Sequence, residues 1–70
     1  MEVLVVNGTE KQFPPGKLPA TIAELLDHLG VNAATVVAEL DGQIIQREDF
    51  AQTGLNAGQT LELIRLMGGG

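Results

Sequence analysis

The sequence predicts an α+β domain, in which one main helix packs across one face of a mixed sheet of about four to five strands. Two observations support this prediction. Short runs rich in strand-forming residues alternate with turn signals, and a single amphipathic segment carries both a start and a stop signal for a helix. A chain of 70 residues is enough for one domain with a small core, which buries only about 60% of the surface exposed by the unfolded chain.

A hairpin is predicted at the start of the chain. The apolar run over residues 3–6 stops at Asn7-Gly8, and this pair favours a type I′ turn because both central residues need a positive φ. The chain should return over residues 9–13. Residues 14–16 read Pro-Pro-Gly and should end the second strand, because proline cannot donate to a ladder.

The helix is the best-specified element. Thr21 and Glu24 have the spacing of a capping box, in which the Thr hydroxyl accepts from one free amide and the Glu reaches back to another. Gly30 stands where a left-handed glycine would close the helix. A helix of about three turns is expected, with an apolar stripe formed by Ile22, Leu25, Leu26 and Leu29.

Three further strands are expected in the second half of the chain. Residues 36–40 and 43–45 flank the hairpin-type turn Asp41-Gly42, and residues 60–67 form a long last strand after a turn at 56–58. The polar segment between them carries Phe50, which we expect to be anchored in the core.

The last strand becomes apolar on both faces towards its end. Leu61 and Leu63 should point to one face, and Ile64 and Leu66 to the other. One interpretation is a strand that is buried on both sides or lies centrally in the sheet. The other is an exposed patch through which Ile64, Leu66 and Met67 bind a partner, since exposed apolar patches mark interaction sites.

The chain ends in Gly68, Gly69 and Gly70. Glycines cost backbone entropy and pack nothing, so they do not serve the fold. We expect a folded domain over residues 1–67 and a flexible tail over 68–70. Three extended residues span about 10 Å, enough to carry the terminal carboxylate of Gly70 into the active site of a partner. The alternative is that the glycines are a frayed end without function.

Composition excludes several classes of function. Nine acidic and four basic residues give a net charge of −5, and only two residues are aromatic, so nucleic-acid binding is not expected. No apolar run is long enough for a membrane span or a signal peptide, so we expect a cytoplasmic protein. The absence of cysteine excludes iron–sulfur ligation, and the absence of serine excludes a phosphopantetheine carrier.

An enzyme would have to depend on His28, the one histidine. A histidine near the end of a helix is more often a solvated residue that complements the helix dipole.

Arg47 also has two interpretations. The favoured one is a surface residue pairing with Glu48 or Asp49, a pair worth little in solvent; the other is a residue that orients its segment near a partner.

Three stretches of the sequence together resemble the ThiS family of thiamine-pathway sulfur carriers, which have the ubiquitin-like β-grasp fold. They are residues 3–8, residues 44–50 with their apolar pair, arginine and aromatic, and residues 61–70 with their strand running into glycines. The sequence departs from the family pattern at Met67, where a small β-branched residue would be more typical. It also departs at Pro14-Pro15, which lengthen the second turn.

The resemblance implies that this chain is a protein co-substrate rather than an enzyme. An E1-like adenylyltransferase of the ThiF type would convert the Gly70 carboxylate to an acyl-adenylate. Sulfur from cysteine, delivered through a desulfurase persulfide, would then leave a thiocarboxylate for thiazole synthase of the ThiG type. ATP and magnesium would be held by the activating partner, because the chain has no phosphate-binding loop and no clustered metal ligands.

Other carriers share such a terminus. The small subunit of molybdopterin synthase has the same fold and activation chemistry, although it is usually longer. A protein-conjugating modifier and a carrier for cysteine synthesis also remain open. We expect the free protein to be a monomer.

Overall fold

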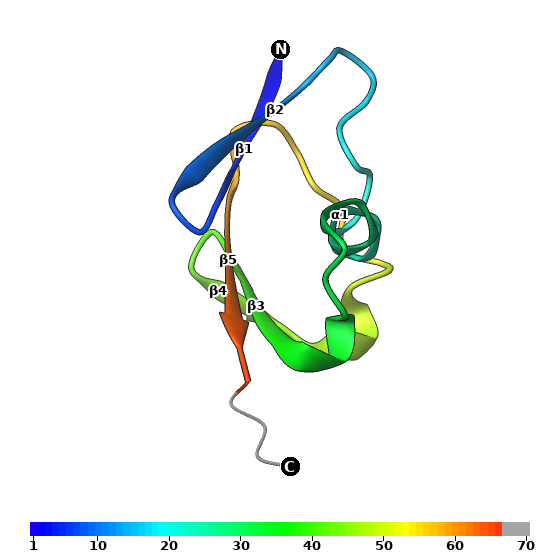
Figure 1. Ribbon diagram of the computed structural model, residues 1–70, viewed down its shortest axis with the longest axis vertical. Helices are drawn as coiled ribbons and strands as arrows, with labels where there is room; N and C mark the ends of the chain where they lie inside the picture. The colour runs from blue at the N-terminus through cyan, green and yellow to red at the C-terminus, as the bar shows by residue number, and fades with distance from the viewer. Residues whose placement is uncertain (67–70) are drawn as a thin grey trace.

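The computed structural model describes residues 1–66, which build a five-stranded mixed sheet with one α-helix on one face (Figure 1). The sheet order is β2-β1-β5-β3-β4, with β1 and β5 parallel and every other neighbouring pair antiparallel. This is the predicted α+β architecture. In chain order the elements are β1 (Glu2–Val6), β2 (Thr9–Phe13), α1 (Ile22–Leu29), the 3₁₀ segment η1 (Ala33–Thr35), β3 (Val36–Leu40), β4 (Gln43–Ile45), the 3₁₀ segment η2 (Arg47–Asp49) and β5 (Thr60–Arg65).

Both predicted hairpin turns form, and each also holds β5. Asn7 and Asp41 adopt φ angles of 50° and 48°, and the glycine after each is also at positive φ, as type I′ turns require. The Asn7 Oδ1 accepts a hydrogen bond of 2.7 Å from the Leu63 amide. The Asp41 Oδ1 accepts one of 2.9 Å from the Thr60 amide. The strand that leads to the tail is therefore clamped by a turn on each side.

The helix α1 has the predicted caps but is shorter than predicted. Thr21 Oγ1 accepts from the Glu24 amide at 3.2 Å, and Gly30 closes the helix at φ 72°. Both caps lie outside the helix, so it has eight residues, just over two turns rather than three. Glu24 reaches the amide of Ala20 at 3.5 Å, one residue before the position a capping box specifies. Among residues 1–66, no helix is long and apolar enough to cross a membrane.

The core lies between α1 and the sheet. Phe50 is anchored there with 2% of its surface exposed, as predicted. The helix contributes the buried part of its stripe, and alternate residues of β1, β3 and β5 supply the opposing layer. The wholly buried side chains are Leu4, Ile22, Leu25, Ala38 and Leu61.

The last strand ends at Arg65 and not at residue 67 as predicted. Arg65 pairs with Val36, the first residue of the antiparallel neighbour β3, so β5 has no residue of β3 to pair with beyond Arg65. The next amide, that of Leu66, donates instead to the carbonyl of Thr35 in η1, a segment the sequence did not predict. Residues 67–70 lie outside the described residues. They comprise the last residue of the predicted domain and the whole of the predicted tail.

Candidate functional site at the root of the tail

The point where the chain leaves the sheet is fixed by a set of local hydrogen bonds. The Leu66 amide donates to the Thr35 carbonyl at 2.8 Å. Thr35 is itself held, because its hydroxyl donates to the Asn32 carbonyl at 2.7 Å. The Asn32 side chain accepts from the Ala34 amide at 2.9 Å and so caps η1. These hydrogen bonds hold the backbone at Leu66, so the chain leaves the sheet from a fixed position.

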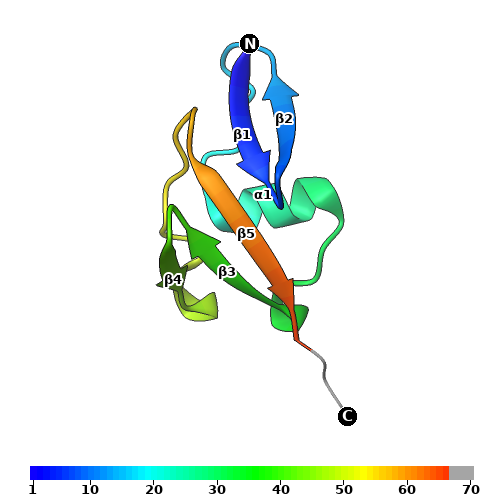
Figure 2. The same ribbon diagram turned by 90° about the vertical axis from the view of Figure 1, so that its left-hand side faces the viewer.

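An exposed apolar surface adjoins this root. We call it the tail-root patch and define it by Val37, Ile44, Ile64 and Leu66. Strand register places the first three on the face of the sheet opposite α1, with Val37 directly across from Ile64. Ile44, Ile64 and Leu66 are 63%, 54% and 50% exposed. β5 lies centrally in the sheet, as one interpretation predicted, but it is not buried on both faces. Figure 2 shows the sheet from the uncovered side, with α1 behind it.

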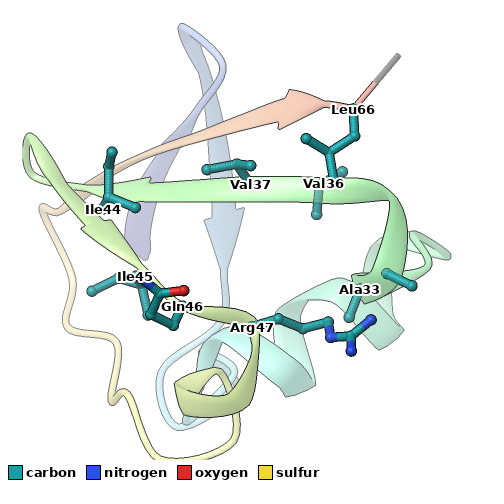
Figure 3. Close-up of a pocket in the computed structure, with 9 residues that line it drawn as sticks. Ala33, Val36, Val37, Ile44, Ile45, Gln46, Arg47 and Leu66 are labelled. Atoms are coloured by element: carbon teal, nitrogen blue, oxygen red, sulfur yellow. The ribbon is translucent and has the colours of Figure 1, made fainter. Parts of the chain in front are cut away.

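A pocket of about 290 Å³ lies at the end of the sheet beside Leu66 (Figure 3). Its walls are mainly apolar and come from η1, the start of β3, the end of β4 and Leu66. Among residues 1–66, Arg47, at the start of η2, is the charged residue that lines it. In Figure 3 the Arg47 side chain extends towards Ala33 of η1, so the guanidinium lies between the two 3₁₀ segments.

The charges on this face are unevenly placed. Glu39 of β3 and Glu62 of β5 stand directly opposite each other on the uncovered face, and both are half-buried. Like charges in this register repel. Arg47 lies at the other end, beside the pocket. Within residues 1–66, no group of three His, Asp or Glu side chains is arranged to hold a metal ion.

His28 is not part of this site. It is exposed in the last turn of α1, on the helix-covered side of the sheet, and its ring lies 5.5 Å from that of Phe13 between centroids. This placement agrees with the interpretation of His28 as a solvated residue near the helix end.

The structure brings together some of the predicted site residues. Ile64 and Leu66 are both exposed and belong to the tail-root patch, whereas Met67 and the three terminal glycines lie outside the described residues. The sequence did not reveal that η1 and Arg47 would meet Leu66 around one pocket. Arg47 was singled out within the stretch 44–50, but nothing in its local pattern signalled its long-range neighbours.

Comparison with known proteins agrees with this architecture. The crystal structure of the thiamine biosynthesis protein ThiS from Geobacter metallireducens superposes with a TM-score of 0.81 at 36% identity, covering 97% of this chain and 99% of that one. The solution structure of a thiamine biosynthesis protein from the same organism gives a TM-score of 0.76 at 37% identity, covering 100% of this chain and 88% of that one.

A curated relative is named thiazole synthase and comes from Paramagnetospirillum magneticum. It is 36% identical over 67 residues, which are 96% of this chain but only 20% of the relative. The chain therefore spans about a fifth of the length of that protein. The model of the ThiS family matches residues 4–70. The chain belongs to the ThiS family, and its fold is the ubiquitin-like β-grasp.

Proposed function

We propose that this protein is the sulfur carrier for thiazole formation in thiamine biosynthesis, with Gly70 as the residue that carries the sulfur. The observation that supports the proposal best is family membership over residues 4–70, a range that includes the terminal glycines. The geometry is compatible with it, because a fixed tail root adjoins an exposed apolar patch. A partner can therefore dock on the domain and receive the tail at the same time.

The proposed chemistry has three steps. The Gly70 carboxylate attacks the α-phosphorus of ATP in a ThiF-type adenylyltransferase, which releases pyrophosphate and forms an acyl-adenylate. A persulfide, charged by a cysteine desulfurase, attacks the acyl carbon and displaces AMP. A thiol then reduces the resulting acyl disulfide and leaves a thiocarboxylate. Adenylation is needed because a carboxylate is a poor electrophile until its oxygen becomes part of a good leaving group.

In this scheme the chain is a co-substrate and performs no catalysis. ATP and magnesium belong to the activating partner, and thiazole synthase is the acceptor. The P. magneticum relative supports this acceptor, because a protein named thiazole synthase contains a region similar to this chain. Ile64, Leu66 and Met67 are proposed to contact the partner, while Gly68 and Gly69 pass through its entrance without side chains to obstruct them. The free protein is proposed to be a cytoplasmic monomer.

The test is the intact mass of the protein after incubation with MgATP, a ThiF-type adenylyltransferase and a persulfide donor. We expect a gain that corresponds to one oxygen replaced by sulfur. Deleting Gly70, or adding one residue after it, should abolish the gain and leave the fold intact by circular dichroism. A truncated protein that still accepts AMP would contradict the assignment to Gly70.

The same experiment separates the thiamine pathway from its nearest alternative. If the wild-type protein stays unmodified by an adenylyltransferase that is active on another ThiS protein, the thiamine assignment is wrong. The activating enzyme of the molybdopterin pathway is then tested in its place.

A further inference from the structure

We infer that the pocket beside Leu66 receives an apolar side chain of thiazole synthase, and that a carboxylate next to that side chain pairs with Arg47. The inference rests on the proposed function, because it takes thiazole synthase as the acceptor. The recognition site would combine an apolar pocket with the cation of Arg47 at its wall.

The size and lining of the pocket suit a side chain. Its volume of about 290 Å³ is just below the range for small-molecule sites, roughly 300–1,000 Å³. Seven of the nine residues that line it are apolar, and the two polar ones, Gln46 and Arg47, are consecutive in the sequence. A bulky aliphatic or aromatic side chain would bury apolar surface on both partners.

The charge distribution selects an acidic neighbour for that side chain. Arg47 lines the pocket, is exposed, and carries the charge there within the described part of the chain. A guanidinium pairs with a carboxylate through two parallel hydrogen bonds, which fixes orientation as well as affinity. Further along the same face, Glu39 and Glu62 repel an approaching acid. Glu48 and Asp49, next to Arg47 in η2, do the same from that side.

The position of the pocket explains why the acceptor must cover it. Four residues follow Leu66, and fully extended they span about 13 Å. An enzyme that holds the Gly70 carboxylate in its active site must therefore approach the tail root within that distance. Because Leu66 is both the root and a wall of the pocket, the pocket lies within the surface that docking covers.

The commitment to thiazole synthase follows from the P. magneticum relative. There, a region 36% identical to this chain makes up a fifth of the polypeptide. The presence of such a region in a protein named thiazole synthase indicates that the two act together, so we assign the pocket to that enzyme rather than to the activating enzyme.

The experiment measures binding of the full-length protein to thiazole synthase by isothermal titration calorimetry, without any sulfur donor. We expect Arg47→Gln to weaken binding about tenfold and Arg47→Glu to weaken it more, as truncation of an interface anchor does. Ala34→Leu, which places a side chain in the pocket, should weaken binding without changing any charge. Lys17→Gln is the matched control, because it removes an exposed cation outside the pocket and should leave affinity unchanged.

Each outcome bears on the inference. Loss of affinity with Arg47→Gln and Ala34→Leu, but not with Lys17→Gln, supports it. Unchanged affinity with Ala34→Leu overturns the pocket as the binding site, and equal losses with Arg47→Gln and Lys17→Gln overturn specific pairing. The same variants are also titrated against the activating enzyme, and a loss of affinity confined to that enzyme overturns the choice of partner. Thiocarboxylate formation on the wild-type protein, measured separately, shows whether the proposed function itself fails.

Discussion

Both faces of the sheet carry aliphatic side chains, but these side chains are buried on one face and exposed on the other. On the face under α1, Leu4, Ala38 and Leu61 have no exposed surface. On the other face, Ile64 and Leu66 remain half exposed, although they lie only a few residues further along the chain than Leu61. Alternation along β5 sends neighbouring residues to opposite faces. Apolar composition therefore specifies burial only where another element of the same chain covers the face.

The largest expected effect is on the free energy of unfolding, when leucine is replaced by alanine on each of the two faces. Leu61→Ala should lower the free energy of unfolding by about 2–5 kcal/mol, because it leaves a cavity in the core. A domain of this size has a total stability of only about 3–5 kcal/mol, so the variant should be largely unfolded. Leu66→Ala, the matched change at an exposed position, should cost less than about 0.5 kcal/mol.

Urea denaturation followed by circular dichroism measures both variants. Similar losses at the two positions would show that the uncovered face is a second core, and would remove the distinction between the faces.

A smaller effect concerns the acidic pair on the uncovered face. Glu62→Gln should stabilise the free protein by about 0.2–1 kcal/mol, because it removes the repulsion from Glu39 directly across the strands. The gain should shrink in high salt, which screens exposed charges. Denaturant midpoints at low and high ionic strength test this. Glu10→Gln is the control, since Glu10 faces Val5 across the strands; an equal gain there would attribute the effect to net charge alone.

The smallest effect on stability is expected at Ile64. Ile64→Thr keeps a β-branched side chain, so the free energy of unfolding should change by less than about 0.5 kcal/mol. The affinity of the Ile64→Thr variant for the activating enzyme should nevertheless fall several-fold, because the change removes apolar surface from the tail-root patch. Titration calorimetry with that enzyme measures the affinity. An unchanged affinity would exclude Ile64 from the docking surface.

Most of the fold was predictable because its boundaries are set by local chemistry. Asn7 and Asp41, each followed by glycine, fix both hairpins. β2, β3 and β4 have the predicted limits, and β1 begins one residue earlier than predicted, at Glu2. Thr21 and Gly30 likewise fix both ends of the helix. Such positions act through backbone angles and hydrogen bonds within a few residues, which a linear sequence displays directly.

The features that were missed depend on distant parts of the chain. The segment η1 has no apolar period, and its importance comes from the bond between Thr35 and Leu66, which are 31 positions apart. The early end of β5 reflects the limited length of β3 rather than any residue in β5. The pocket joins three separate stretches of the chain, residues 33–37, residues 44–47 and Leu66, so no single motif could indicate it.

The parallel pairing of β1 with β5 has a mechanical consequence. Both strands point the same way, so the beginning of β1 and the end of β5 lie at opposite ends of the sheet (Figure 2). When a partner pulls on the tail, the load acts along β5 and shears its bonds to β1 and β3 together, instead of opening them one after another. The clamps from Asn7 and Asp41 add to the same resistance. Under the proposed function, a partner that holds the tail would therefore load a strand that is paired on both sides.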